Sequence, residues 1–355
     1  MPRLRRSDWT KPGYTRRRRG AAFSYRAPDG SALRDPEELE RVKALAIPPA
    51  WRRVWICPYP NGHIQAVGID DAGRRQYIYH SFWRQRQDAR KFERALDFAA
   101  RLPVIRTAVT RDLAAEEFSR DRAYAAAVRI MDIGALRIGS SEYADSNGSY
   151  GVSTLQASHV NVKGSSIELD FPGKSGQRWQ TVIEDAAVAA FVAAVVGGGS
   201  PTALAYRLND CWHSVDAGAL NEYLRRISGG DFTAKDFRTW QATVLAAGSL
   251  ARAEKALRSE ARHARASTAR RSAAGAAVRS AAGRPKRHGG VSETARRRAV
   301  AATMREVAEH LGNTPAVTRK SYVDPRIVDR FMDGETVPLS AGRASESAVR
   351  QFLAD

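Results

Sequence analysis

Five residues that could act together on a phosphodiester are spread over most of this 355-residue chain: Arg137, Lys174, Arg238, Asn313 and Tyr322. A nucleophile that attacks a phosphodiester produces a five-coordinate phosphorus with extra negative charge on its non-bridging oxygens. Two fixed guanidinium groups stabilise that charge more strongly in the transition state than in the ground state. Arg137 and Arg238 fit this role, and Asn313 can donate a neutral hydrogen bond to the same oxygens.

Tyr322 is the candidate nucleophile and Lys174 is the candidate general acid. A neutral phenol, with an ordinary pKa near ~10, is a weak nucleophile, and a neighbouring cationic cluster makes the developing phenolate less costly. The leaving 5′ oxygen needs a proton when its bond to phosphorus breaks, and a lysine in a tight glycine-flanked turn can supply one. Either residue alone would more often be an ordinary surface or core residue.

Lys174 lies between two runs of alternating apolar and polar residues, at 167–171 and 179–183, which are joined by a glycine-rich turn. This pattern predicts a β-hairpin with the lysine at its tip. The Gly-Lys-Ser sequence is also found in P-loops, but a P-loop needs glycine at position 168, which is Glu168, and a helix after the lysine. We therefore expect no bound nucleotide.

Helix signals position the other candidate residues. Arg137 follows an alanine-rich amphipathic segment, and Arg238 falls on a helix with one strongly apolar face. Thr314 followed by Pro315 is typical of a helix N-terminus, and Tyr322 comes two turns later, where that short helix ends. Tyr322 can lie beside Asn313 only if the chain folds back around the phosphate.

In their order along the chain, the sequences around these residues resemble the catalytic half of type IB DNA topoisomerases of the small poxvirus-like and bacterial kind. The resemblance implies that Tyr322 forms a 3′-phosphotyrosyl bond with one strand of duplex DNA, and that the 5′-hydroxyl reverses the attack after strand rotation. It implies no cofactor, no metal and no ATP. The segments that carry it are Leu-Arg-Ile-Gly-Ser at 136–140, Pro-Gly-Lys-Ser-Gly at 172–176, Lys-Asp-Phe-Arg-Thr-Trp at 235–240, Leu-Gly-Asn-Thr-Pro at 311–315 and Lys-Ser-Tyr-Val-Asp-Pro at 320–325.

Residues 46–80 contain short apolar and aromatic runs separated by turn signals, which predicts an antiparallel sheet with strands near 53–59, 63–68 and 75–80. Tyr77 and Tyr79 alternate onto one face of the last strand, and periodicity alone favours a core position for them. The segment Gly-Arg-Arg-Gln-Tyr-Ile-Tyr-His at 73–80, however, resembles the DNA-clamp domain of the same family. That resemblance implies that Gln76, Tyr77, Tyr79 and Tyr143 contact DNA.

Positive charge is concentrated in two segments. Residues 1–20 contain eight Lys or Arg against Asp8 alone, and residues 251–300 contain fourteen against three Glu, so the two segments carry nearly all of the net charge of +19. Blocks of like charge in Ala-, Gly- and Ser-rich sequence are typical of disordered arms that attract phosphates without sequence preference. We expect such an arm at 1–20 and a disordered insert at 251–298; a solvated basic tail without function is the alternative.

Composition indicates a protein of the reducing cytoplasm. The two cysteines, Cys57 and Cys211, lie far apart and outside any CxxC motif, which argues against a disulfide framework and a cysteine-based zinc site. The basic N-terminus lacks the apolar segment of a secretory signal, and no apolar run approaches membrane-spanning length. We expect a cytoplasmic, nucleoid-associated protein without a membrane segment.

These patterns predict an α+β fold, in which a small antiparallel β-rich N-terminal domain precedes a larger, mainly α-helical catalytic domain that carries a β-hairpin, as in tyrosine recombinases and type IB topoisomerases. The expected segments are a flexible arm at 1–20, the clamp domain at 21–90, the catalytic domain at 91–340 and a C-terminal tail at 341–355. The resemblance implies a topoisomerase that relaxes supercoiled double-stranded DNA as a monomer closing around it as a clamp.

Two other functions stay open at this point. A tyrosine recombinase would share the covalent chemistry, but recombinases usually have His-x-x-Arg-His at the second arginine, where this chain has Lys-Asp-Phe-Arg-Thr-Trp. A catalytically silent DNA-binding protein would depend on the basic segments and would bind DNA without cleaving it. Detection of recombinant junctions would favour the former function, and binding without strand cleavage would favour the latter.

Overall fold

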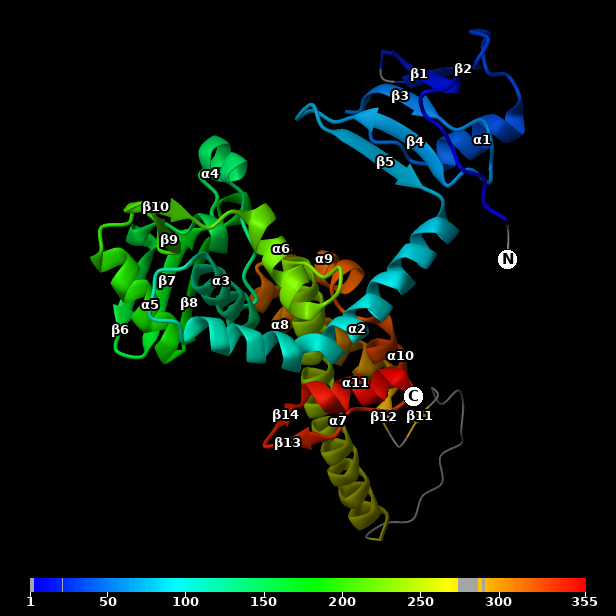
Figure 1. Cartoon of the computed structure of the whole chain (residues 1–355). Coiled ribbons are helices and arrows are strands. Elements are labelled where there is room, and N and C mark those ends of the chain that lie inside the picture. The colour runs from blue at the N-terminus through cyan, green and yellow to red at the C-terminus, as the bar shows by residue number, and fades with distance from the viewer. Residues whose placement is uncertain (1–2, 21, 274–286, 289–290) are drawn as a thin grey trace. The chain divides into compact units, whose positions relative to one another are not determined.

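The computed structural model describes residues 3–20, 22–273, 287–288 and 291–355 (Figure 1). The chain forms two compact units, Met1–Lys91 and Phe92–Asp355. The first unit is built around an antiparallel sheet, and the second is mainly helical with a three-stranded sheet that includes a hairpin. The predicted α+β class is therefore confirmed.

The sheet of the first unit has five antiparallel strands in the order β2-β1-β3-β4-β5. One of its faces packs against helix α1 (Pro36–Ala44), around a core that includes Val42, Ile56 and Ala66 (Figure 1). The three strands predicted between residues 53 and 80 are all present. The strands are β1 (Tyr14–Arg19), β2 (Ala22–Arg26), β3 (Arg52–Ile56), β4 (Ile64–Ile69) and β5 (Arg75–Tyr79).

The basic N-terminal segment differs from the predicted flexible arm, because its arginine run forms strand β1. Arg16 Nη1 donates a hydrogen bond to the carbonyl of Ile47 at 2.8 Å, and its Nη2 donates to those of Pro48 and Trp51, both at 2.9 Å. The run of arginines resembles a flexible tail only as long as its partners are unknown. The partners of Arg16 are backbone carbonyls more than thirty residues away, and no sequence pattern predicts them.

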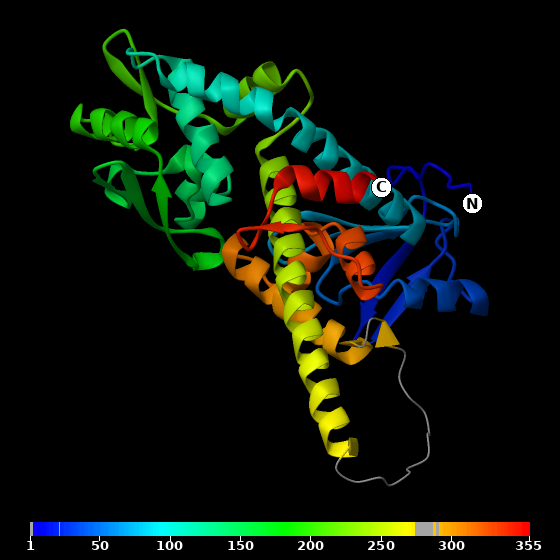
Figure 2. The same cartoon turned by 90° about the horizontal axis from the view of Figure 1, so that it is seen from below.

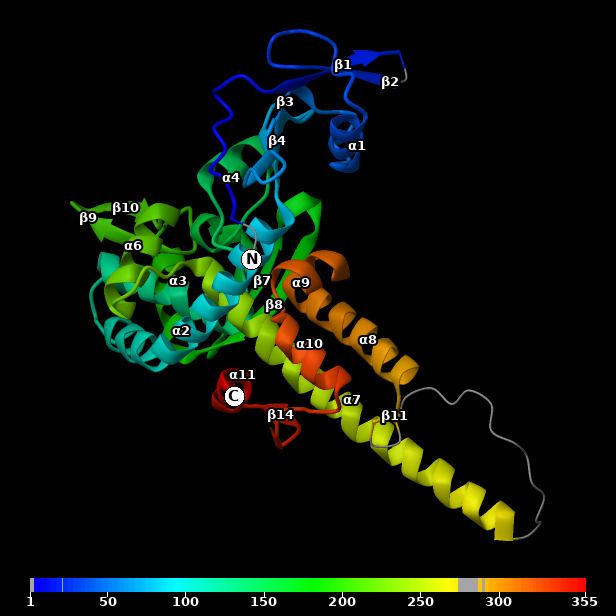
Figure 3. The same cartoon turned by 90° about the vertical axis from the view of Figure 1, so that its right-hand side faces the viewer.

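The second unit surrounds the long helix α7 (Ala234–Ala273). Helices α8 and α10 lie beside α7 (Figure 3), and the hairpin β13–β14 and helix α11 lie across it (Figure 2). The other helices are α2 (Ser81–Leu113), α3 (Arg120–Gly134), α4 (Ser141–Asn147), α5 (Ala186–Gly197), α6 (Ala217–Ser228), α8 (Glu293–Leu311), α9 (Pro315–Ser321), α10 (Pro325–Met332) and α11 (Glu346–Ala354). The strands are β6 (Val160–Lys163), β7 (Ser166–Pro172), β8 (Arg178–Glu184), β9 (Ala205–Leu208), β10 (Cys211–Ser214), β11 (Arg287–His288), β12 (Val291–Ser292), β13 (Leu339–Ser340) and β14 (Arg343–Ala344).

Much of the segment predicted as a disordered insert is helical. Helix α7 continues to Ala273, and α8 begins at Glu293, while residues 274–286 and 289–290 lie outside the described residues. The ion pair between Glu254 and Arg296, at 2.9 Å and with both side chains almost completely buried, joins the two helices. An alanine-rich composition is compatible with a disordered tail, but it also has high helix propensity. The buried pair of Glu254 and Arg296, which are distant in sequence, favours the helix.

The C-terminal segment 341–355 also packs onto the second unit. Arg106 of α2 binds Asp132 and Glu346, at 2.7 Å for its closest contact with each. Val349 and Leu353 of α11 are buried in the main core. These contacts fix α11 against helices that also position the residues of the candidate active site.

Replacing Arg296 by Met should strongly destabilise the second unit, because it removes the buried cationic partner of the buried Glu254 carboxylate and leaves only the half-exposed Arg258, at 2.7 Å. We expect a loss of about 3–5 kcal/mol in the free energy of unfolding, measured by urea denaturation. Arg297→Met is the matched control, since Arg297 makes an exposed pair with Glu293 at 2.6 Å and should contribute less than about 0.5 kcal/mol. Equal losses for the two variants would contradict this account.

Candidate active site

Arg238 lies in the second turn of α7 and is only 3% exposed. Its Nη1 donates a hydrogen bond to the carbonyl of Ala135, and its Nη2 donates to that of Leu311 at 2.7 Å. Its Nε has no partner among the described residues. Burial and the charge of Arg137 lower the pKa of the Arg238 guanidinium to about 10, although the nearby Tyr322 opposes this shift.

Arg137 occupies the loop that follows α3, whose C-cap residue Ala135 adopts a left-handed conformation. Its Nη2 donates to the side-chain oxygen of Asn313 at 2.5 Å and to the carbonyl of Gly312 at 3.2 Å. Burial lowers the pKa of Arg137, and the proximity of Tyr322 opposes this effect. The two predicted arginines therefore meet at the same turn, between α8 and α9.

The side-chain amide of Asn313 is oriented by Arg137. Because the Asn313 oxygen accepts the bond from Arg137, the amide nitrogen Nδ2 points elsewhere, and this buried atom has no partner in the described chain. An amide N–H in this state is available to donate to an oxygen of a ligand. Asn313 can thus bind an anion without carrying charge.

Tyr322 ends helix α9, as predicted, and Thr314 caps the start of that helix by accepting a hydrogen bond from the amide of Val317. The guanidinium carbon of Arg238 lies 5.5 Å from the centre of the half-buried Tyr322 ring. Thr243 connects helix α7 to the chain that follows α9. Its hydroxyl lies 3.3 Å from the carbonyl of Tyr322 and accepts a hydrogen bond from the amide of Asp324 at 3.2 Å.

Lys174 lies at the tip of the hairpin formed by β7 and β8, which confirms the predicted hairpin. Its side chain is exposed and forms no hydrogen bond or ion pair within the described residues. The base of the tip is fixed by two backbone hydrogen bonds, from Gly173 to Gln177 at 2.8 Å and from Tyr150 to Pro172 at 2.9 Å. The turn is therefore held by backbone bonds, while its ammonium group is open to solvent.

The structure brings together four of the five predicted residues, Arg137, Arg238, Asn313 and Tyr322, and places Lys174 on a separate hairpin of the same unit. Sequence reasoning missed Thr243, as well as the carbonyls of Ala135 and Leu311 that hold Arg238. A threonine inside a helix and two backbone oxygens carry no sequence signal for such roles.

The predicted DNA-contact residues lie on exposed surfaces, with one exception. Tyr77 and Tyr79 are 36% and 37% exposed and stack with ring centres 5.9 Å apart, so the core position favoured by periodicity is wrong. Tyr143 on α4 is exposed as well. Gln76 instead lies on the same face of β5 as Ile78, which packs against the core, and it donates to Asp70 at 2.9 Å.

The face of the sheet that carries these tyrosines also carries arginines from β1. Tyr77 pairs with Val67, Val67 with Trp55 and Trp55 with Thr15, so all four point to the same side. Alternation along β1 puts its exposed residues 17 and 19, both Arg, on that side too. One face of the first unit therefore combines aromatic rings and positive charge.

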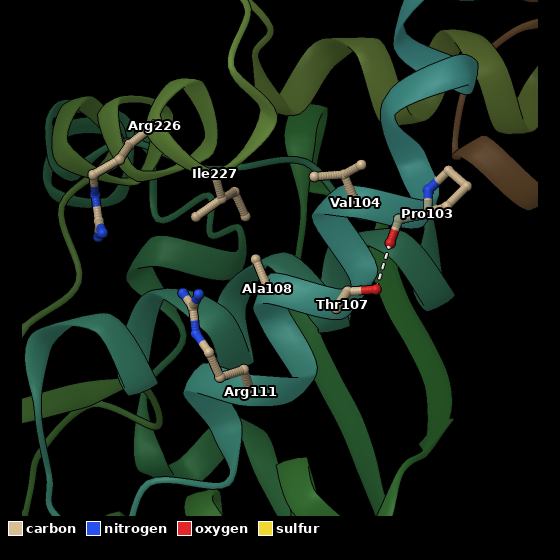
Figure 4. Close-up of a pocket in the computed structure, with 7 residues that line it drawn as sticks. All are labelled: Pro103, Val104, Thr107, Ala108, Arg111, Arg226 and Ile227. Atoms are coloured by element: carbon tan, nitrogen blue, oxygen red, sulfur yellow. Dashed lines mark hydrogen bonds between the residues drawn. The ribbon is translucent and has the colours of Figure 1, made fainter.

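The cavity shown in Figure 4 is distinct from this site. It has a volume of about 600 Å³ and is lined by Pro103, Val104, Thr107, Ala108 and Arg111 of α2 with Arg226 and Ile227 of α6. None of the predicted site residues lines it. Within the described residues, no cluster of His, Cys, Asp and Glu could hold a metal ion, and no helix is long and apolar enough to cross a bilayer.

Comparison with known proteins identifies the family. The model of the eukaryotic DNA topoisomerase I catalytic core matches residues 80–333, and that of the bacterial DNA topoisomerase IB N-terminal domain matches residues 22–70. DNA topoisomerase 1B of Acanthamoeba polyphaga mimivirus is 30% identical over 316 residues, which are 88% of this chain and 85% of that protein. DNA topoisomerase 1 of Daucus carota is 30% identical over 161 residues, which are 43% of this chain and 19% of that protein.

A helical unit with a buried and a partly buried arginine beside a tyrosine, joined to a β-rich N-terminal unit, fits an enzyme that exchanges phosphodiester bonds. The family matches make the assignment specific: the chain belongs to the type IB DNA topoisomerases and is an enzyme of the isomerase class. The prediction from the motifs is confirmed at this level, and neither the recombinase nor the silent DNA-binding protein is favoured.

Thr243→Val should slow DNA strand cleavage, because it leaves the amide of Asp324 without its acceptor and frees the chain around Tyr322. An unsatisfied buried donor costs about 1–3 kcal/mol. If this cost destabilises the conformation in which Tyr322 is placed for attack, the single-turnover cleavage rate should fall on the order of 10-fold. Thr243→Ser keeps the hydroxyl and serves as the control. Cleavage by Thr243→Val at the wild-type rate would show that this contact does not position Tyr322.

Proposed function

We propose that this topoisomerase relaxes supercoiled duplex DNA through a transient 3′-phosphotyrosyl bond to Tyr322. The observation that carries the proposal is the pair of arginines, Arg137 and Arg238, held beside Tyr322 by backbone carbonyls and Asn313, without a carboxylate partner in the described chain. Two neighbouring cations without a protein counter-ion favour an anionic ligand. The scissile phosphate of DNA supplies that charge.

In the proposed cleavage step, the phenolic oxygen of Tyr322 attacks phosphorus and loses its proton to water. The new bond joins that oxygen to phosphorus, and the bond between phosphorus and the 5′ oxygen breaks. Lys174 donates a proton to the leaving oxygen, which becomes a 5′-hydroxyl. Arg137, Arg238 and the free amide N–H of Asn313 stabilise the charge on the non-bridging oxygens.

Religation is the reverse reaction, in which the 5′-hydroxyl attacks the phosphotyrosine after the duplex has rotated about the intact strand. One phosphodiester is exchanged for another, so bond energy is conserved and the reaction needs no ATP. In this proposal Arg137, Arg238 and Asn313 stabilise the charge on the phosphate, so the reaction needs no metal ion.

The proposal extends to the way in which DNA is held. Tyr77, Tyr79 and Tyr143 would contact the duplex, and a single copy of the chain would close on it as a clamp. The stacked tyrosines and the arginines of the same sheet face support this binding mode, since aromatic rings and guanidinium groups both suit nucleic acids. A cytoplasmic protein associated with the nucleoid fits such a substrate.

Tyr322→Phe should abolish plasmid relaxation in EDTA without ATP, because the variant keeps the aromatic ring but lacks the attacking oxygen. Wild type should relax supercoiled plasmid under the same conditions and form a covalent protein–DNA complex after denaturant quenching. Tyr206→Phe removes a hydroxyl from β9, away from the site, and should relax DNA normally. Relaxation by Tyr322→Phe, or a wild type that binds DNA without cleaving it, would contradict the proposal.

Replacing both Arg17 and Arg19 by Gln should weaken DNA binding and reduce its salt dependence. Each lost phosphate contact lowers the slope of log K against log salt by about 0.9, so we expect a decrease of up to about 2 units. Arg18→Gln is the matched control, because Arg18 is exposed on the same strand but points to the other face. Equal slopes for the double variant and the control would exclude this face from the DNA interface.

A further inference from the structure

A tryptophan on the lysine hairpin packs directly against the turn that holds the arginines. Trp179 lies on β8, opposite Phe171 of β7 and just beyond the tip that carries Lys174. A Cβ atom placed on Gly312 would lie only 2.3 Å from Cζ3 of Trp179, so the outer ring of the indole sits on the backbone of this glycine. Only glycine permits such a close approach.

Gly312 is also central to the candidate active site. It ends α8 in a left-handed conformation, with a φ of 56°, and its carbonyl accepts a hydrogen bond from Arg137. The next residue, Asn313, accepts another bond from Arg137. The indole of Trp179 therefore touches the turn that brings Arg137 and Asn313 together.

Few other contacts hold the tip of this hairpin in place. Lys174 itself binds no residue of the described chain, and its side chain is exposed. Besides the backbone bonds at Gly173 and Pro172, the ion pair of Arg178 with Asp170, at 2.6 Å, joins the two strands next to the tip. The indole of Trp179 is the next side chain of β8, and it extends out of the hairpin to Gly312. Its contact links the hairpin to the residues around the phosphate.

We propose that Trp179 is a positioning residue that sets the distance between Lys174 and the scissile phosphate by bracing the hairpin against Gly312. The inference rests on the proposed function, because it gives Lys174 the role of general acid. Trp179 itself touches neither substrate nor reacting atoms in this account. Its loss should impair proton donation to the 5′ oxygen and leave the attack by Tyr322 intact.

A substrate that needs no general acid can separate these two effects. When sulfur replaces the bridging 5′ oxygen at the cleavage site, the leaving group is a thiolate, whose conjugate acid has a pKa of about 8.5, and it departs without a proton. A variant that fails only in proton donation cleaves this phosphorothiolate normally. A variant with a distorted phosphate pocket cleaves both substrates slowly.

The experiment compares single-turnover cleavage of matched oxygen and sulfur substrates by full-length wild type, Trp179→Ala and Lys174→Ala. We expect Trp179→Ala to cleave the oxygen substrate about 10- to 100-fold more slowly, within the range of a lost general acid, and the sulfur substrate within about 3-fold of wild type. Lys174→Ala should show the same selectivity, and the double variant should be no slower than Lys174→Ala alone.

Two further variants complete the design. Trp212→Ala is the matched control, because Trp212 of β10 packs on Gly198 in a similar way, 2.7 Å from an added Cβ, but away from the site. It should cleave both substrates normally. Trp179→Phe, whose smaller ring offers less contact area to Gly312, provides a second test should the alanine variant fold poorly, and it should show a milder defect with the same selectivity.

An equal defect on both substrates, or no defect for Trp179→Ala, would overturn the positioning role. Failure of the underlying proposal looks different, because wild type would then cleave neither substrate. A Lys174→Ala variant that cleaves the oxygen substrate normally would remove the general acid from the scheme, and with it the role of Trp179.

Discussion

The structure of the site depends on holding two guanidinium groups close together without a carboxylate between them. Arg238 is almost completely buried, and the charge of Arg137 helps to lower its pKa to about 10. Helix C-termini make this arrangement possible, since the carbonyls that accept from the two arginines belong to the ends of α3 and α8. These oxygens have no partner within their own helices, and the helix dipole adds negative potential there.

This constraint explains why the elements of the candidate active site come from such distant parts of the chain. Arg238 must sit where α3 and α8 both end, so α7 runs past both. Thr243 on α7 then accepts a hydrogen bond from the amide of Asp324, two residues after Tyr322. The turn after α8 places Asn313 between Arg137 and the start of α9. Lys174 lies outside this cluster, on a hairpin, which spares the site a further like charge.

Local sequence signals correctly predicted the elements whose formation depends on neighbouring residues. The hairpin of Lys174 and the caps of α9 were evident from turn and capping residues. Predictions failed where partners far away in sequence decide the outcome: β1 is ordered by carbonyls near residue 50, α7 and α8 are joined by Glu254 and Arg296, and the exposed tyrosines of β5 looked like core. The meeting of the two arginines followed from the family resemblance, because no spacing rule connects residues a hundred positions apart.

The account is tested most directly by identifying the amino acid and the DNA end that are joined when cleavage is trapped. Wild-type protein would be mixed with a labelled duplex, quenched in denaturant and digested, and the nucleotide-bearing peptide sequenced by mass spectrometry. We expect a 3′-phosphate linked to Tyr322 and a free 5′-hydroxyl on the other product. An adduct on another residue, or one formed through a 5′-phosphate, would contradict the assignment of Arg137 and Arg238 to the Tyr322 phosphodiester.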